Sequence, residues 1–341
     1  MLNRRIFSIL FITIFVLGLV GCGGGSTATQ APSGDEQQPT AQSSAANFRV
    51  AMVFPGAIND KSWNQAGYDG LMRIQKELGV ETSFQENVAA SDWEEAMRTY
   101  ASQGYNLVIG HGDQFSDASK VVSAEFPNTM FVVVNGANSG PNLASISLFD
   151  EQVTYLAGIV AAKMSKSGKI GYIGGLEIPP VVRNGKGFEA GAKSVNPDIE
   201  VSTTYLGDFN DASKGKETTL SMADQGVDVI YYYVDNAMVG IQEAAKEKNI
   251  KLIGCIFDQH DMAPDLILTS TIQDTSTAIF QAAQQAKEGT LKGGMVLFGL
   301  DSGAIKLAQF STDVPADVQA AVKQAQDDII AGKIKIERTQ Q

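Results

Sequence analysis

From residue 48 onward, short apolar runs rich in β-branched residues alternate with longer stretches in which apolar residues recur at helical spacing. An alternation of strand and helix patterns predicts parallel sheets that are covered by helices on both faces. The strands expected from this pattern are residues 48–53, 80–84, 107–109, 131–134, 143–147, 169–173, 201–205, 229–233, 251–253, 266–271 and 295–298. The expected helices include 63–78, 115–125, 151–164 and 315–331, and another is expected to open at Ser91 with a capping-box pattern.

The series of strands and helices runs twice along the chain, and the second series begins after residues 143–147. We therefore expect an α/β protein with two doubly wound parallel-sheet lobes joined by a hinge. The first lobe is expected mainly over 48–148 and the second mainly over 149–265, within a binding region of 48–341 whose remaining segments cross between the lobes. Ligands of such sheets bind at the carboxyl ends of the strands, so the pattern predicts a shared cleft that closes by hinge motion.

The first residues have the pattern of a bacterial export signal. Arg4 and Arg5 precede a run of 15 uncharged residues, Ile6 to Val20, which is short for a membrane span. The run ends in Leu-Val-Gly-Cys, which resembles the box cleaved by lipoprotein signal peptidase, so residues 1–21 are expected to be removed and Cys22 to be lipidated. Several acyl chains on Cys22 would anchor the protein stably. The alternative is a non-lipidated signal or an uncleaved anchor, with Cys22 incidental.

Residues 22–47 are expected to be a tether between the anchor and the folded region. After Cys22 they contain mainly Gly, Ser, Thr, Gln, Ala and Pro with hardly any bulky apolar side chains, so they cannot pack into a core. No second apolar run of spanning length follows. The folded region is therefore expected beside the membrane, on its extracytoplasmic face.

Composition and charge exclude several classes of function. The formal net charge is −12, whereas nucleic-acid binding needs a basic footprint, and no helix-turn-helix pattern precedes Phe48, so we expect no nucleic-acid partner. Two cysteines and two histidines, Cys22, Cys255, His111 and His260, cannot build a His-rich metal centre. Nucleophile-elbow and P-loop motifs are absent as well. We expect a binding protein, not an enzyme, with no metal and no cofactor.

The loop after the first strand, residues 54–67, carries the most suggestive chemistry. Asn59 and Asp60 offer an amide and a carboxylate at a helix mouth, and Trp63 and Asn64 start that helix. An indole beside an amide suits a planar heteroaromatic ligand, because the ring can stack while the amide pairs with ring nitrogens. A helix cap followed by a core tryptophan would give the same residues, and the chemistry alone leaves both interpretations open.

Several segments of the chain resemble one known family. Residues 59–65, Asn-Asp-Lys-Ser-Trp-Asn-Gln, are similar to the N-D-K-S-F-N signature of the basic membrane protein family, the PnrA-like lipoproteins. Further similar segments are 101–110, 169–175, 188–191 and 207–217, so the resemblance covers roughly 48–310. It implies a type I periplasmic-binding-protein fold and the capture of purine nucleosides for an ABC importer.

Carried over position by position, the resemblance implies a set of ligand-binding residues. Trp63 would cover one face of the base and Phe209, in the other lobe, the opposite face. Asn64 would bond the base edge. The remaining residues that it places near the ligand are Asn59, Asp60 and Asp117, with His111 as a weaker candidate.

Two positions depart from the family's pattern. The family's GVDVDQ segment reads Gly-Cys-Ile-Phe-Asp-Gln here, so Ile256 replaces an acid, and Gln273 replaces the lysine of the family's SMLKR segment. In the family these positions are associated with ribose hydroxyls, so the changes favour a free purine, another aromatic metabolite, or a ribose that is held otherwise. Polar residues that remain available are Asp235, Asn236, Asp258 and Gln273.

The expected function is that of a lipid-anchored, monomeric solute-binding protein that delivers a purine nucleoside or nucleobase to an ABC permease and its ATPase. The alternative is a receptor of the same fold that binds a sugar or a signalling molecule and feeds a sensor. Elsewhere the pattern indicates structural roles. We expect Tyr231 to Tyr233 to form an alternating strand, Cys255 to be a buried small side chain, His260 to lie in a loop, and the small residues of 151–164 to suit close helix packing.

Overall fold

The computed structural model describes residues 48–59 and 63–338. The chain divides into two units, Met1–Ser43 and Ser44–Gln341, and every described residue falls in the second. The predicted signal peptide, the lipidated Cys22, the tether and Asp60 lie outside the described residues.

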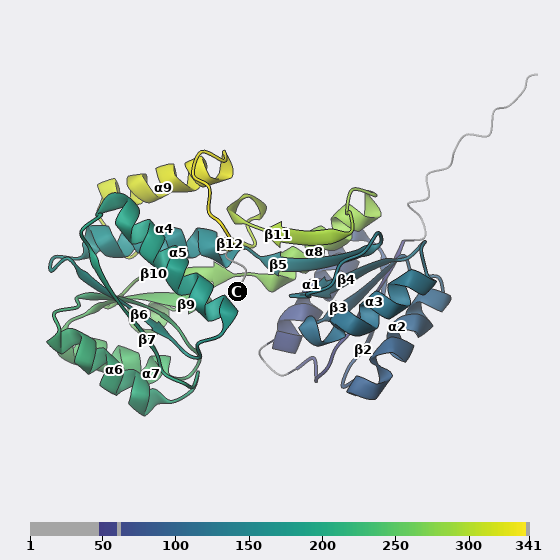
Figure 1. Cartoon of the computed structure of the whole chain (residues 1–341), viewed down its shortest axis with the longest axis horizontal. Helices are drawn as coiled ribbons and strands as arrows, with labels where there is room; N and C mark the ends of the chain where they lie inside the picture. Colours follow the sequence, from purple (N-terminus) through teal and green to yellow (C-terminus); the bar gives the residue numbers. More distant parts are fainter. Residues whose placement is uncertain (1–47, 60–62, 339–341) are drawn as a thin grey trace, which may run out of the picture. The chain divides into compact units, whose positions relative to one another are not determined.

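The first of two sheets is formed mainly by the N-terminal half of the described chain (Figure 1). Its six strands run in the order β11-β5-β4-β3-β1-β2, and each pairing between neighbours is parallel. One edge strand, β11, comes from far along the sequence. The strands are β1 (Arg49–Val53), β2 (Glu81–Gln85), β3 (Leu107–His111), β4 (Met130–Val134), β5 (Leu143–Leu148) and β11 (Gly294–Phe298).

The second sheet also has six strands, in the order β12-β10-β9-β8-β6-β7. Its pairings are parallel except that the short edge strand β12 runs antiparallel to β10. The strands are β6 (Lys169–Gly174), β7 (Glu200–Tyr205), β8 (Val229–Tyr233), β9 (Lys251–Ile256), β10 (Ile267–Gln273) and β12 (Ile305–Leu307). Two doubly wound α/β sheets confirm the predicted fold class.

Helices connect the strands and cover the sheets. The α-helices are α1 (Trp63–Leu78), α2 (Trp93–Ser102), α3 (Ser116–Glu125), α4 (Asp150–Met164), α5 (Pro179–Val195), α6 (Ala212–Asp224), α7 (Met238–Lys248), α8 (Thr275–Lys287) and α9 (Ala316–Ile330). Short 3₁₀ helices occur at Ala90–Asp92, Asp113–Phe115, His260–Met262 and Leu300–Ser302. No helix within residues 48–59 and 63–338 is long and apolar enough to span a membrane.

Helix α4 packs closely against α5 through its small residues, which confirms the packing predicted for 151–164. A Cβ atom on Gly158 would lie 2.0 Å from the Phe188 carbonyl oxygen, and one on Gly191 would lie 1.8 Å from the Tyr155 carbonyl oxygen. Each helix backbone therefore occupies the space that a side chain on the other would need. The two helices cover one side of the second lobe, and the N-terminal end of α4 lies at a cavity.

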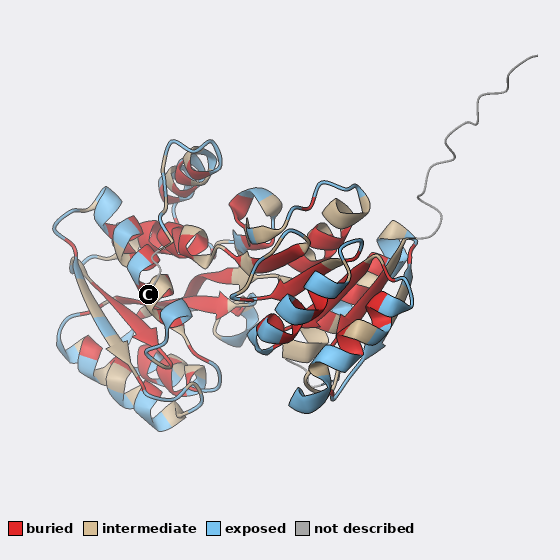
Figure 2. Ribbon diagram, turned by 45° about the vertical axis from the view of Figure 1, so that its right-hand side comes forward, coloured by how far each residue is buried: buried red, intermediate tan, exposed pale blue. Residues whose placement is uncertain are grey.

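The strands of both sheets are buried, whereas the helices expose their outer faces (Figure 2). The predicted alternation in β8 is wrong, because Tyr231 and Tyr232 are both fully buried. Since β8 lies in the middle of a sheet that has helices on both faces, neither side of the strand meets water. Cys255, in the neighbouring strand, is buried as predicted.

The capping box predicted at the start of α2 is also wrong. A 3₁₀ turn, closed by a hydrogen bond from the Asp92 N–H to the Ala89 carbonyl, precedes the helix. The turn leaves Asp92 with φ −110° and ψ 0°, and its side chain accepts no capping hydrogen bond from the helix. It accepts one from the Ser91 hydroxyl instead, at 2.9 Å.

Candidate ligand-binding cleft

A cavity of about 690 Å³ lies at the carboxyl ends of strands from both sheets. Its lining includes Asn135 after β4, Asp150 after β5, Asp235 after β8, Phe257 after β9 and Gln273 at the end of β10. Its volume falls within the range of small-molecule sites, roughly 300–1,000 Å³. The cavity therefore lies where the topology of two parallel sheets predicts a ligand site.

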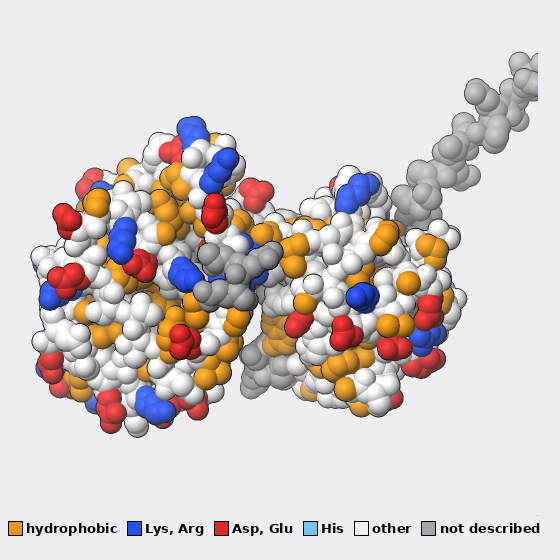
Figure 3. All heavy atoms as spheres, in the orientation of Figure 1, with side chains coloured by type: hydrophobic (Ala, Val, Ile, Leu, Met, Phe, Trp, Pro, Cys, Tyr) orange, Lys and Arg blue, Asp and Glu red, His pale blue; other side chains and the backbone are white. Residues whose placement is uncertain are grey.

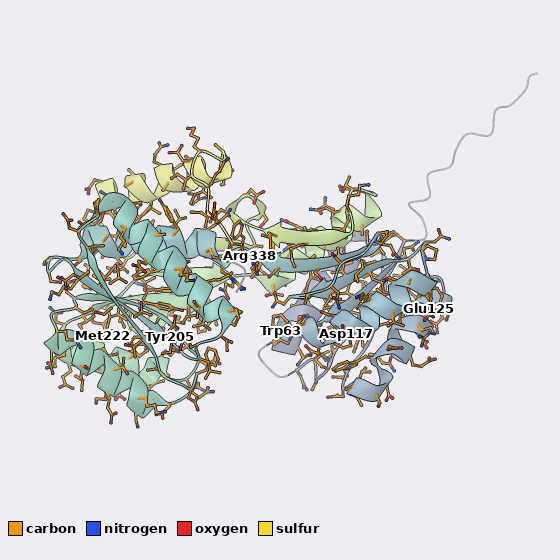
Figure 4. All side chains as sticks on the ribbon, viewed as in Figure 1. Trp63, Asp117, Glu125, Tyr205, Met222 and Arg338 are labelled. Carbon is orange, nitrogen blue, oxygen red and sulfur yellow. The ribbon has the colours of Figure 1, made fainter. Side chains whose placement is uncertain are left out.

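The aromatic side of the cleft is built by Trp63, the first residue of α1. Its indole stacks on the imidazole of His111, with ring centroids 4.3 Å apart and planes inclined by 18°. His111 ends β3, is fully buried, and its Nε2 lies 2.8 Å from the Trp63 carbonyl oxygen. His111 covers one face of the indole, and Trp63, labelled in Figure 4, lines the cavity.

A buried ion pair lies in the wall of the cleft. Arg183 of α5 places Nε 3.1 Å from Oε1 of Glu151, and only 16% and 4% of these side chains are exposed. Arg338 approaches the same carboxylate at 4.0 Å and donates to the Leu148 carbonyl at 3.2 Å and the Ser147 hydroxyl at 3.1 Å. Both arginines line the cavity, but the protein itself already binds their guanidinium groups.

Asp150 and Gln273 form the polar part of the same wall. The Tyr233 hydroxyl donates to Gln273 Oε1 at 3.0 Å. Asp150 Oδ1 and Gln273 Nε2 are buried and lack a hydrogen bond of normal geometry within the described part of the chain. The cleft wall thus places a carboxyl group and a side-chain amide beside each other.

The electrostatics of Asp150 follow from its position. Burial, assisted by the neighbouring Glu151 carboxylate, raises the pKa of this carboxyl group to about 7, although Arg338, Arg183 and the nearby Gln273 amide oppose the increase. Desolvation also raises the pKa of Asp235, across the cavity at the end of β8. Asp150 can therefore keep its proton near neutral pH and donate a hydrogen bond inside the cleft.

Three of the residues predicted from the sequence line this cavity: Trp63, Asp235 and Gln273. Asn64 does not line the cavity. A Cβ atom on Gly56 would be 2.8 Å from Asn64 Nδ2. Its amide therefore packs against the loop that follows β1. Asn59, in the same loop, is exposed.

Phe209 packs against the second lobe and is not part of the cavity lining. A Cβ atom on Gly175 would lie 2.1 Å from Phe209 Cδ1, so the ring rests directly on the backbone after β6. The Phe209 carbonyl accepts hydrogen bonds from the N–H groups of Asp235 and Ala237 at 2.9 and 3.1 Å. In this arrangement the residue supports the loop that carries Asp235.

The remaining predicted residues are engaged at the rim or in a neighbouring groove. Asp117 accepts a hydrogen bond from Asn138 at 3.0 Å, and Asn236 donates one to Asn210 at 3.0 Å. Asp258 lines the groove that adjoins the cleft and accepts from the His260 N–H at 3.1 Å.

Sequence reasoning missed several lining residues, among them Asn135, Asp150, Arg183, Phe257 and Arg338. Asn135 and Phe257 follow a strand directly and Asp150 comes two residues after one, so the rule that ligands bind at strand ends could have found them. No local pattern marks Arg338, because a residue far along the chain reaches the cleft only through the tertiary fold.

The fold defines the class: an α/β protein with two doubly wound sheets and a cavity at the carboxyl ends of their strands. Among solved structures, an ABC transporter solute-binding protein from Aeropyrum pernix K1 is similar, with a TM-score of 0.65 and 26% identity over 86% of this chain and 94% of that one. The family model for PnrA-like ABC transporter substrate-binding proteins matches residues 48–340. The chain belongs to this family, which is a class of binding proteins and not of enzymes.

Relatives in the family carry different names. The nucleoside-binding protein BmpA of Lactococcus lactis subsp. cremoris is 33% identical, with 82% of this chain and 86% of that protein covered. A purine-binding protein of Brucella abortus is 30% identical, with 84% and 82% covered. The transcriptional activator protein Med of Bacillus subtilis is 33% identical, with 80% and 86% covered.

Proposed function

We propose that this protein captures a purine nucleoside or nucleobase outside the cytoplasm and delivers it to an ABC permease and its ATPase, held at the membrane by lipidated Cys22. The observation that carries the proposal is the cleft itself. One face of the Trp63 indole lies on it, and the opposite sheet contributes hydrogen-bonding groups at Asp235 and Gln273.

Stacking and polar pairing have separate tasks in this proposal. A purine ring lies against Trp63, and stacking of a base on an aromatic side chain contributes about 1–3 kcal/mol with little preference among bases. Discrimination then comes from hydrogen bonds to the ring edge in the closed cleft, where an unmatched polar group is costly. Closure is favoured because contacts from both lobes are complete only in the closed state.

The charges around the cleft support an uncharged ligand. Asp113, Asp150 and Asp235 line the cavity, and the two arginines that line it are bound to Glu151 and to β5. Among the described lining residues no other cation is available to a phosphate group. Nucleosides and bases therefore fit this lining better than nucleotides do.

Calorimetric titration of the purified protein with adenosine, inosine, guanosine, their free bases, AMP and ribose tests the proposal. We expect binding to at least one nucleoside or base and none to AMP. Binding of ribose alone, or of no compound in the series, would overturn it.

A regulatory role is the second candidate, and the similarity to Med favours it. The two roles make different predictions for a deletion strain. Loss of labelled purine uptake supports transport, whereas altered transcription with normal uptake supports regulation or a receptor that feeds a sensor. On the face of the molecule shown in Figure 3, basic side chains are scattered among acidic ones, an arrangement that offers no basic footprint there for DNA.

A further inference from the structure

The backbone makes an unusual turn where β9 ends. The Phe257 N–H donates to the Cys255 carbonyl at 2.8 Å, which closes a three-residue γ-turn around Ile256. Ile256 has φ +69°, a value that a β-branched side chain rarely adopts. The turn therefore stores backbone strain, and such strain persists only where neighbouring structure enforces it.

Residues on both sides of the turn supply that enforcement. Cys255 is fully buried, and Gln259 is 1% exposed. The Gln259 N–H donates to the Ser270 hydroxyl at 3.1 Å, its Nε2 donates to the Cys255 carbonyl at 2.8 Å, and its Oε1 accepts from the Tyr232 hydroxyl. Hydrogen bonds thus hold the chain at Cys255 and at Gln259, and Phe257, between these two residues, projects outward.

As a result, the phenyl ring of Phe257 is held in an exposed position. Phe257 is 48% exposed, packs against neither hydrophobic core cluster, and stacks on no other aromatic ring of the described residues. It lines the cleft together with Trp63, and it also lines the adjoining groove. An exposed phenyl ring and a strained turn are both unfavourable for folding, so their coincidence at one cavity points to a role in binding.

We propose that Phe257 is the second aromatic contact of the ligand and lies on the face of the ring opposite Trp63. This inference rests on the proposed function, because it requires a planar ring in the cleft. It gives Phe257 the role that the sequence assigned to Phe209, whose ring rests on the backbone at Gly175 and is not part of the cavity lining. Aromatic contacts prefer offset-stacked or edge-on arrangements, and a ring on a short outward turn can adopt either.

Ile256 adds to the same surface. Its side chain lines both the cleft and the groove beside Phe257. Together the two residues form an apolar platform where a ligand ring meets carbon and no charged group. The platform thus selects for the flat, uncharged part of a ligand, while Asp150 and Gln273 take its polar part.

Titration of three full-length variants and the wild type with adenosine and adenine tests the inference. Phe257→Ala should raise Kd at least tenfold, and Phe257→Tyr, which keeps the ring, should stay within about threefold of the wild type. Met262→Ala is the matched control, because Met262 is 47% exposed five residues later and lines neither cavity. Its Kd should be unchanged, and circular dichroism should show that all three variants are folded.

Each outcome points to one conclusion. If the wild type binds and Phe257→Ala binds equally well, Phe257 is not a ligand contact and the proposed function stands. Phe209→Ala is titrated as a further variant; if it loses affinity while Phe257→Ala does not, closure brings Phe209 to the ring and the inference is overturned. If the wild type binds neither compound nor any other purine, the proposed function fails and the inference fails with it.

Discussion

Trp63 and His111 form a stacked pair whose centroids lie 4.3 Å apart, and they join the start of α1 to the end of β3. The imidazole is buried and also contacts Phe54, at a centroid distance of 5.4 Å. A Cβ atom on Gly67 would lie 2.6 Å from the same imidazole, so α1 fits tightly over it. The indole is therefore oriented before a ligand arrives, which reduces the entropy lost on binding.

Replacing the indole tests this arrangement. We expect Trp63→Ala to raise the Kd for the bound purine at least tenfold, because the ring loses its stacking surface, and Trp63→Phe to have a smaller effect. Isothermal titration measures both values. Trp93→Phe serves as the control, since Trp93 packs on Phe115 and donates to the Val88 carbonyl away from the cleft. Equal affinity of Trp63→Ala and wild type would show that the indole is only structural.

Glu151 is expected to be important for stability. Removing one partner of a buried ion pair leaves an unpaired charge and typically costs about 3–5 kcal/mol. Glu151→Gln strands Arg183 and weakens the contact of Arg338, so its free energy of unfolding should fall by an amount in that range. Urea denaturation gives the value. The double variant Glu151→Gln with Arg183→Met should recover part of the loss, and a double variant as unstable as the sum of its single changes would contradict the pairing.

The raised pKa of Asp150 predicts a pH-dependent stability. The folded state keeps the Asp150 proton up to a pKa of about 7, whereas the unfolded chain releases it near 3.8. Between these values the folded state binds more protons, so this group's contribution to stability falls as pH rises from about 4 to 7 and stays low above that.

Asp150→Asn removes the charge but keeps the shape of the side chain. It should therefore raise the melting temperature more at pH 8 than at pH 5. Thermal unfolding at the two pH values measures the difference. An equal shift at both would mean that the carboxyl group titrates normally in the folded protein.

The proposed lipidation of Cys22 predicts a simple fractionation result. Cys22→Ala should move the protein from the membrane fraction to the soluble extracytoplasmic fraction, because no acyl chains remain to anchor it. Immunoblotting of the fractions shows the distribution, and Cys255→Ala is the control, because Cys255 is buried in β9. Retention of Cys22→Ala in the membrane would favour an uncleaved N-terminal anchor.

Much of the fold could be predicted because hydrophobic periodicity reports burial directly. The helix Trp63–Leu78 and the strand Val229–Tyr233 occur with the expected bounds. The failures arose where tertiary structure overrides local pattern. The alternation expected for the three tyrosines of β8 required that one face of the sheet meet water. The cap expected at Ser91 does not form, because Ser91 lies inside a 3₁₀ turn that no sequence pattern predicted.

The candidate site was less accessible to sequence reasoning than the fold. Trp63 and Gln273 line the cavity because strand and helix ends converge there. Phe257 was overlooked because strand β9 was expected to end at residue 253, whereas it continues to Ile256 and places the next residue at the cleft. Arg338 reaches the cleft from a segment that is distant in sequence, and only the three-dimensional fold shows such a contact.

Strand β11 and helix α8 belong to the first lobe although they come late in the sequence, and this affects how the protein folds during synthesis. Helix α8 packs beside α1, where Arg73 donates to Thr277 at 2.8 Å, and β11 pairs with β5 at the sheet edge. A chain that emerges from the ribosome N-terminus first cannot complete this lobe until residue 298 has appeared. Most of the polypeptide must therefore be present before its first half can close its own core.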